Sequence, residues 1–215
     1  MNNYCKLTIL SLFSFLILNC KSETSKTLLE KKINTMENKL DTATLGAGCF
    51  WCVEAVFQQL KGVEKTISGY SGGKIKNPAY KEVCTGQTGH AEVIQVIFNP
   101  TIISFKELLE VFWQTHDPTT LNRQGADVGT QYRSVIYFHN NEQKEIAETL
   151  KNSLNSENIF GKPVVTEISA FTQFYPAEDY HQNYFLENGE QPYCQYVIVP
   201  KMEKFKKLFG NKIKN

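Results

Sequence analysis

The sequence lacks the motifs by which many enzymes bind nucleotides and metals. Its 215 residues contain no dinucleotide-binding fingerprint and no phosphate-binding loop, so no bound nucleotide cofactor is expected. The four histidines show no metal-ligand spacing, and the cysteines do not form two Cys-x-x-Cys pairs, so no zinc site is predicted. Internal repeats and low-complexity runs are also missing. The length then favours one globular domain with appendages.

An excess of charge of either sign is also lacking. The 23 Lys and Arg residues nearly balance the 22 Asp and Glu residues, which leaves a formal net charge of +1. No basic stripe points to a nucleic acid, and no polyanionic partner is expected. The charge therefore excludes partner classes without identifying a substrate.

The apolar run near the N-terminus, from Leu7 to Leu18, is too short to span a membrane. It falls below the roughly 20 residues that a membrane-spanning helix needs and fits the apolar core of a secretory signal. Cys20 follows this run, as in a bacterial lipoprotein signal, where the cysteine is lipidated and becomes the mature N-terminus. Because Asn19 stands where Gly, Ala or Ser is usual, an ordinary cleaved signal or an uncleaved anchor stays an alternative.

Three regions follow from this interpretation. Residues 1–20 are a signal peptide of lipoprotein type, residues 21–41 are a polar tether rich in Lys and Glu, and residues 42–215 are the catalytic domain. We expect a bacterial protein exported to the periplasm or cell envelope. It would meet a membrane only through a lipid anchor on Cys20, and its domain is expected to be a monomer.

Strand-like and helix-like runs alternate beyond the tether. The predicted strands and helices, in chain order, are 43–45, helix 50–60, 63–70, 90–98, helix 105–116, 132–138, helix 142–154, 164–169 and helix 200–209. Ser104 and Glu107 form a capping box at the start of the second helix. The first six elements have the order strand-helix-strand-strand-helix-strand. This order predicts a ferredoxin-like, two-layer α+β core (βαββαβ) with a C-terminal tail. The segments 71–90, 117–131 and 171–196 are predicted to be long active-site loops.

The stretch from Gly46 to Cys52 is the strongest chemical signal in the chain. Here a glycine-rich turn joins a strand to a helix, and Cys49 stands at the helix start. A helix N-terminus favours a thiolate through its dipole and its free N–H groups, so we expect Cys49 to be a nucleophile. The alternative is a buried cysteine beside core aromatics, because Phe50 and Trp51 follow directly.

Three predicted loops carry further polar side chains. Asn77 to Tyr80 is a turn that presents a tyrosine, and the segment Asp127 to Ser134 supplies an acid and Tyr132. Glu92 would share a strand face with apolar residues, and desolvation there would raise its pKa and keep a proton available. Taken alone, Glu92 would be read as a surface residue at a strand end.

Together these segments resemble the peptide methionine sulfoxide reductase A family. The matching stretches are GCFW at Cys49 with its flanks, GYSGG at 69–73, TGHAE at 88–92, FWQTHDP at 112–118, GTQYRS at 129–134 and YPAEDYHQNY at 175–184. They occur in the family's order and cover the chain from about residue 42 to residue 200. The resemblance is specific because no single short pattern carries it.

The resemblance implies reduction of the S epimer of free or protein-bound methionine sulfoxide, and so repair of oxidised proteins. Cys49 would attack the sulfur and become a sulfenic acid, while Glu92 protonates the departing oxygen. Tyr80 and Tyr132 would polarise that oxygen, and Asp127 would orient the group. Phe50 and Trp51 would form the apolar wall around the substrate methyl. No bound cofactor is implied, only an external thioredoxin-like reductant, with dithiothreitol as its substitute in vitro.

Two cysteines are candidates for the resolving thiol, because the chain departs from the commoner family pattern here. Cys52 stands where many members have glycine, and no glycine lies in the segment Gln191 to Tyr196. Cys194 is the first candidate, because a tail loop could reach Cys49 without distorting the helix. Cys52 is the alternative, in a Cys-x-x-Cys arrangement with Cys49. Cys84 is interpreted as structural.

Two other functions remain on sequence grounds. The Cys49-x-x-Cys52 pair would suit a thiol–disulfide oxidoreductase that acts on protein disulfides. A non-catalytic lipoprotein binding module would leave the thiols incidental. Glu92, Tyr80 and Tyr132 favour sulfoxide reduction over both of these functions, because disulfide exchange needs no acid directed at a sulfoxide oxygen.

The lipoprotein interpretation makes a direct prediction for Cys20→Ala. This variant should leave the membrane fraction or remain unprocessed, because two buried acyl chains anchor a protein stably where one is marginal. Cell fractionation of wild type and variant, with the mature N-terminus read by mass spectrometry, measures it. A soluble wild-type protein that begins at another residue would contradict the anchor but not export.

Overall fold

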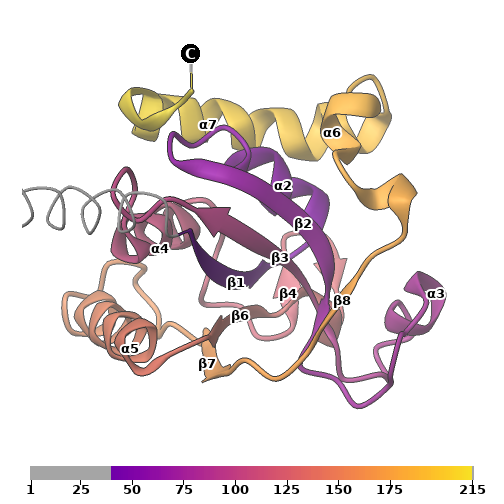
Figure 1. The fold of residues 1–215 in the computed structure, drawn as a ribbon, viewed down its shortest axis with the longest axis horizontal. Helices are drawn as coiled ribbons and strands as arrows, with labels where there is room; N and C mark the ends of the chain where they lie inside the picture. Colours follow the sequence, from indigo (N-terminus) through magenta and orange to yellow (C-terminus); the bar gives the residue numbers. More distant parts are fainter. Residues whose placement is uncertain (1–39, 215) are drawn as a thin grey trace, which may run out of the picture. The chain divides into compact units, whose positions relative to one another are not determined.

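A six-stranded sheet is the centre of the fold in the computed structural model, which describes residues 40–214 (Figure 1). Its strands are β1 (Asp41–Ala47), β2 (Val63–Ser71), β3 (Ala91–Phe98), β6 (Ser134–Phe138), β7 (Glu167–Ala170) and β8 (Phe174–Pro176). They lie in the order β7-β6-β1-β3-β2-β8. Every pairing is antiparallel except that of β6 with β7.

The four inner strands form the predicted ferredoxin-like core. The chain runs β1, α2 (Phe50–Phe57), β2, β3, α4 (Phe105–Gln114), β6, and the strands lie in the order β6-β1-β3-β2. β1 and β2 both pair antiparallel with β3, so they are parallel to each other, as a split βαβ unit requires. The α+β fold class predicted from the sequence is confirmed.

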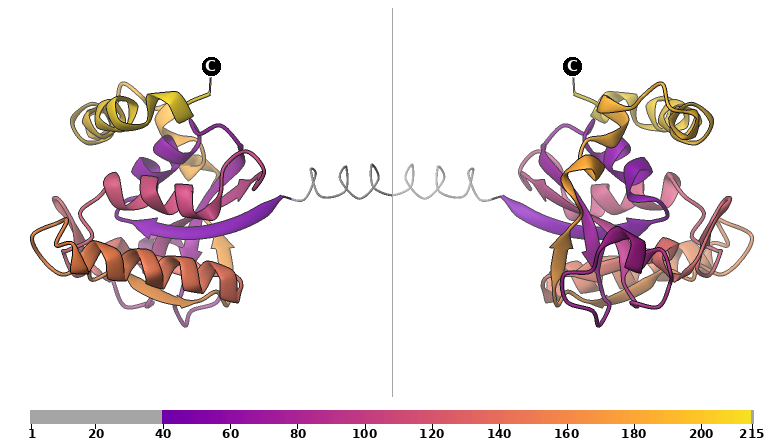
Figure 2. Two further views of the ribbon diagram at one scale, coloured as in Figure 1. Left: turned by 90° about the vertical axis from the view of Figure 1, so that its left-hand side faces the viewer. Right: turned by 90° about the vertical axis from the view of Figure 1, so that its right-hand side faces the viewer.

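Helices cover one face of the sheet. Besides α2 and α4, these are α5 (Asn141–Ser156) and α7 (Val199–Phe209), which lie at the lower left and along the top of Figure 1. All four helices contribute to one hydrophobic cluster with the inward side chains of β1 and β3. The left view of Figure 2 shows α7 (yellow) above α2 and α5 (orange) below α4. The opposite face carries a smaller cluster around Val93 and Val135, which Phe171 and Phe174 cover.

The local signals read from the sequence explain where α4 begins. Ser104 Oγ accepts a hydrogen bond from the Glu107 N–H at 3.2 Å, and Glu107 accepts one from the Ser104 N–H at 2.9 Å. This reciprocal capping box satisfies two N–H groups that have no partner inside the helix. The capping prediction is therefore confirmed at both residues.

The structure corrects several predicted boundaries. α2 ends at Phe57 rather than near residue 60, and Leu60 instead forms an isolated bridge with Ile213. Tyr80 begins a short helix, α3 (Tyr80–Val83), rather than ending a turn. Tyr132 precedes β6 in a 3₁₀ turn, and the strand predicted at 164–169 is β7, which begins at residue 167.

The largest correction concerns the segment 171–196, which was predicted to be a loop. It contains β8, a 3₁₀ turn (Asp179–His181) and α6 (Tyr184–Glu187), and it ends in a π-helical turn (Cys194–Ile198) that continues into α7. Aromatic residues at irregular spacing gave no periodic signal for these short elements. Cys194 therefore lies in a helix and not in a free tail loop.

The remaining strands form a small hairpin, β4 (Arg123–Gln124) with β5 (Asp127–Val128). No helix among the described residues is long and apolar enough to cross a membrane. The predicted signal peptide, Cys20 and nearly all of the predicted tether lie outside the described residues. Those interpretations stay predictions.

Candidate active site

Cys49 lies at the N-terminus of α2, as the sequence predicted. It is the N-cap residue, and its carbonyl accepts the first helical hydrogen bonds, from the N–H groups of Cys52 and Val53. Its side chain is largely buried, with 8% exposed. The turn before it depends on two glycines. A Cβ at Gly46 would lie 2.8 Å from the Glu92 carbonyl oxygen, and Gly48 has a φ of +91°, which favours glycine.

Glu92 meets the same helix end from the sheet. Its Oε2 accepts a hydrogen bond from the Phe50 N–H at 3.0 Å, so the carboxyl group lies at the first turn of α2. Glu92 is 1% exposed, on the β3 face that also carries the core residues Ile94 and Val96. Burial raises the pKa of Glu92 to about 8, against the lowering effect of the Phe50 N–H. The expected carboxylic acid is therefore protonated at neutral pH.

Two phenols, those of Tyr80 and Tyr132, lie near this carboxyl group. Burial raises the pKa of each phenol, and Glu92 raises both further through its charge. Each phenol is therefore a hydrogen-bond donor throughout the physiological range. Tyr80 is held in place through its N–H, which donates to Glu178 Oε1 at 2.9 Å. The structure brings together the acid and the two phenols that the sequence proposed.

Trp51 lies at the centre of an aromatic cluster. Its indole stacks on Tyr184 with ring centroids 3.6 Å apart and planes at 6°, and meets Tyr193 edge-on at 5.7 Å. The indole Nε1–H donates to Nδ1 of His181 at 3.1 Å. The Phe50 ring packs 5.1 Å from the His181 ring. These contacts fix the two aromatic residues that follow Cys49.

The sequence analysis missed His181, Tyr184 and Tyr193 as neighbours of Trp51. All three come from the segment that was predicted to be a loop. Burial lowers the pKa of His181, so the imidazole is neutral and accepts the Trp51 hydrogen bond. Only the motif at 175–184 hinted at them, and that motif gave no contact partners.

Asp127, the expected orienting residue, binds Tyr193. It lies in β5, and its Oδ2 accepts a hydrogen bond from the Tyr193 hydroxyl at 2.9 Å. The same hydroxyl lies 3.9 Å from the Cys52 sulfur. Asp127 is therefore connected through Tyr193 to the second cysteine of the Cys-x-x-Cys pair.

The two cysteines at the start of α2 have different pKa values. Burial is the main cause that raises the pKa of the Cys49 thiol. The interaction with Cys49, followed by the charge of Lys201, lowers the pKa of Cys52 to about 7 against the effect of burial. Burial therefore opposes the thiolate that the helix start was expected to favour at Cys49. In this environment desolvation outweighs the helix N-terminus, and Cys52 is the more acidic thiol.

Cys194 and Cys84 differ in their surroundings. Cys194 is fully buried in the main core cluster, in the first turn of the π-helical segment. Burial is the main cause that raises its pKa, and the charge of Cys52 raises it further. Cys84 is exposed at the end of α3, beside the Tyr80 side chain. All four described cysteines are free thiols.

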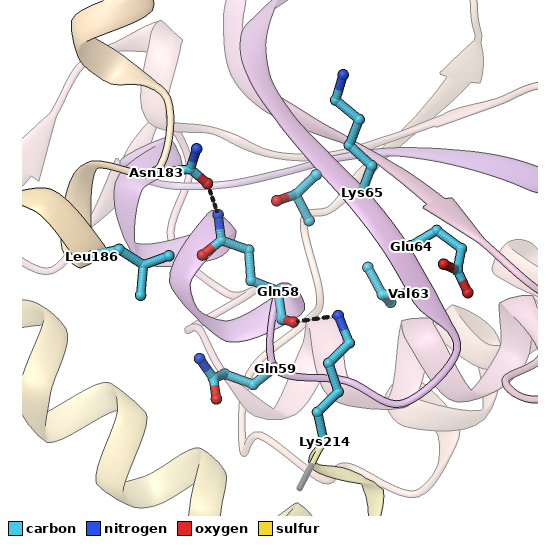
Figure 3. Close-up of a pocket in the computed structure, with 9 residues that line it drawn as sticks. Gln58, Gln59, Val63, Glu64, Lys65, Asn183, Leu186 and Lys214 are labelled. Atoms are coloured by element: carbon cyan, nitrogen blue, oxygen red, sulfur yellow. Dashed lines mark hydrogen bonds between the residues drawn. The ribbon is translucent and has the colours of Figure 1, made fainter.

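No group of His, Cys, Asp and Glu side chains in residues 40–214 is arranged to hold a metal ion. A cavity of about 330 Å³ lies on another part of the surface, between the end of α2 and the start of β2 (Figure 3). Its lining includes Gln58, Lys65, Asn183 and Lys214 and none of the predicted site residues.

The group of residues around the start of α2 instead combines a thiol pair, a protonated acid, two phenols and an apolar wall. It can attack a polarised centre and protonate a departing oxygen.

The family model described as peptide methionine sulfoxide reductase matches residues 41–213. The chain is 55% identical over 175 residues to the peptide methionine sulfoxide reductase MsrA of Saccharolobus solfataricus, which covers 81% of this chain and 98% of the relative. It is 54% identical over 175 residues to the MsrA of Leptospira borgpetersenii, with the same two coverages.

Two solved structures resemble the fold. Mxr1 from Saccharomyces cerevisiae in reduced form has a TM-score of 0.68 and 35% identity, covering 73% of this chain and 90% of its own. Methionine sulfoxide reductase A of Corynebacterium diphtheriae has a TM-score of 0.63 and 37% identity, covering 70% of this chain and 76% of its own. Both are similar to this chain over most of the described residues.

Proposed function

Because this chain belongs to the peptide methionine sulfoxide reductase family, we propose that it reduces the S epimer of free or protein-bound methionine sulfoxide through Cys49. The chain is accordingly an enzyme, an oxidoreductase of protein repair. The hydrogen bond between the Phe50 N–H and Glu92 carries the proposal, because it places a protonated carboxyl beside the Cys49 thiol. Disulfide exchange would need no such acid, which is why we favour sulfoxide reduction over a thiol–disulfide oxidoreductase.

In the first step Cys49 attacks the sulfoxide sulfur. The Cys49 proton passes to the Cys52 thiolate, Glu92 gives its proton to the sulfoxide oxygen, and the resulting hydroxyl group moves from the substrate sulfur to the Cys49 sulfur. The products are methionine and a sulfenic acid on Cys49, so the substrate sulfur is reduced and the enzyme sulfur oxidised. Tyr80 and Tyr132 donate hydrogen bonds to the same oxygen. When the substrate methyl group packs against Phe50 and Trp51 and its oxygen binds the two phenols, only one epimer presents its sulfur to Cys49.

In the second step we propose that Cys52, rather than Cys194, first resolves the sulfenic acid. Cys52 attacks the Cys49 sulfur, a disulfide forms and water leaves. Two features support this order: Cys52 lies one turn after Cys49 on the same helix, and the interaction with Cys49 is the main cause that lowers the pKa of Cys52, whereas Cys194 lies in a separate helical turn. Cys194 then attacks the Cys49 sulfur of this disulfide and Cys52 leaves as a thiol. The external reductant reduces the resulting Cys49–Cys194 disulfide and is itself oxidised.

The reductant is proposed to be a thioredoxin-like protein, with dithiothreitol as a substitute in vitro. If the predicted lipoprotein signal at residues 1–20 acts, the domain lies outside the cytoplasm. A cytosolic thioredoxin would then not meet it directly, and an exported thioredoxin-like partner is required. Oxidised proteins of the same compartment would be the substrates.

A single-turnover experiment tests the proposed function. The reduced wild-type protein should release one equivalent of methionine from the S epimer without added reductant and none from the R epimer. Cys49→Ser should release none while keeping its fold by circular dichroism, because a hydroxyl is a much poorer nucleophile at neutral pH. Methionine released at the wild-type rate by folded Cys49→Ser would overturn the mechanism.

Glu92→Gln should slow the single-turnover step about 100- to 10,000-fold, because the amide keeps its size but supplies no proton. Burial raises the pKa of Glu92 to about 8, so the wild-type rate should fall as the pH rises through 8 and the acid loses its proton. This alkaline decline should be missing in Glu92→Gln. Rates within a few-fold of wild type across pH 6 to 9 would remove Glu92 from the acid role.

Cys52→Ser and Cys194→Ser separate the two resolving thiols. Cys52→Ser should release one equivalent of methionine slowly and accumulate the sulfenic acid, which a dimedone adduct detects by mass spectrometry. Cys194→Ser should still form the Cys49–Cys52 disulfide at the wild-type rate and lose turnover with thioredoxin. A rapid Cys49–Cys194 disulfide in Cys52→Ser would return the first resolving role to Cys194.

A further inference from the structure

Glu54 is a buried carboxyl group that the proposed reaction does not use. It lies in α2, one turn after Phe50, and only 1% of the residue is exposed. Its neighbours Val53 and Ala55 belong to the main hydrophobic cluster. A carboxylate buried among such residues is costly unless hydrogen-bond donors compensate it. The partners of Glu54 therefore show what it stabilises.

Glu54 contacts the start of α6, where its Oε2 accepts a hydrogen bond from the Tyr184 N–H at 3.3 Å. Burial raises the pKa of this carboxyl, and the backbone of Asn183 and Tyr184 and the Ser68 side chain lower it. Asn183 has a φ of +53°, in the left-handed region that residues other than glycine seldom adopt. From outside, Gln58 Nε2 donates to Asn183 Oδ1 at 2.8 Å, as Figure 3 shows. The turn into α6 is thus held by Glu54 of α2 and by Gln58, the residue that follows this helix.

The turn that Glu54 holds carries the aromatic contacts of Trp51. Tyr184, whose N–H binds Glu54, stacks its ring on the Trp51 indole at 3.6 Å. His181, three residues earlier, accepts the indole N–H. Glu54 and Trp51 lie on the same helix, so α2 holds the segment 181–184 at its backbone and at its rings. Loss of the backbone contact would free the rings that fix Trp51.

We propose that Glu54 is a positioning residue that sets the orientation of Trp51 through Tyr184 and His181. Its effect on the enzyme is then a tighter pocket for the oxidised methionine side chain. This second part rests on the proposed function, in which Trp51 lines that pocket. The first part, the order of Trp51, does not depend on any activity.

The test compares Glu54→Gln and Glu54→Ala by two readouts. The KM for the sulfoxide should rise about 10-fold in Glu54→Ala and about 3-fold in Glu54→Gln, whose amide oxygen still accepts one N–H, with little change in the saturating single-turnover rate. Acrylamide quenching of tryptophan fluorescence should increase in the same order. The chain has two tryptophans, and Trp113 is only 2% exposed, so the change reports Trp51.

Val56→Ala is the matched control. Val56 lies on the same helix, is 1% exposed and packs in the core, so its truncation lowers the melting temperature without touching the segment 181–184. Its KM and quenching should equal those of the wild type.

Glu54 variants that lose stability but keep wild-type KM or wild-type quenching would overturn the proposal. If Glu54→Ala does not fold, Glu54→Gln decides alone. A wild-type protein that fails to reduce sulfoxides would instead refute the proposed function, while quenching would still test the Glu54 contact.

Discussion

The hydrogen bond from the Phe50 N–H to Glu92 is the contact on which the site depends. It joins the middle of the sheet to the first turn of α2, and it requires the close approach of chains that Gly46 allows. Because the carboxyl group is buried there, its pKa rises to about 8 and it keeps its proton. The contact thus holds the carboxyl group at the helix start, and burial keeps it protonated against the lowering effect of the Phe50 N–H.

Two further carboxyl groups extend this principle around the aromatic cluster. Glu178 accepts the Tyr80 N–H and the Tyr70 hydroxyl, so it ties the segment after β8 to α3 and to β2. Glu54 accepts the Tyr184 N–H of the same segment at its other end. Each carboxyl binds donors that an irregular backbone leaves without a helical or sheet partner. Carboxylates, rather than regular secondary structure, hold the part of the chain that covers Trp51.

The sequence predicted well those parts in which a periodic pattern faces a single core. The four core strands, α4 with its Ser104 cap, and the position of Cys49 at a helix start were all recoverable from spacing. The segment 171–196 could not be predicted, because its conformation depends on contacts with residues more than 100 positions away, such as that of Gln182 with Ser68. Single-residue contacts of this kind leave no periodicity. The family resemblance located the site residues in the sequence, but it said nothing of Glu54 or of the Tyr193 contact to Asp127.

The acidity of the two cysteines shows why position on a helix does not decide reactivity alone. A thiol at a helix N-terminus is favoured as a thiolate by roughly the few tenths to 2 kcal/mol of a helix-dipole interaction. Burial opposes ionisation of Cys49 and is the largest influence on it, and the buried Glu92 adds to the opposition. Cys52, one turn further on, gains the Cys49 hydrogen bond and the charge of Lys201, and so becomes the acidic partner. The negative charge of the pair therefore lies on Cys52 rather than on the attacking sulfur of Cys49. In the proposed mechanism, attack by Cys49 therefore requires that its proton pass to Cys52.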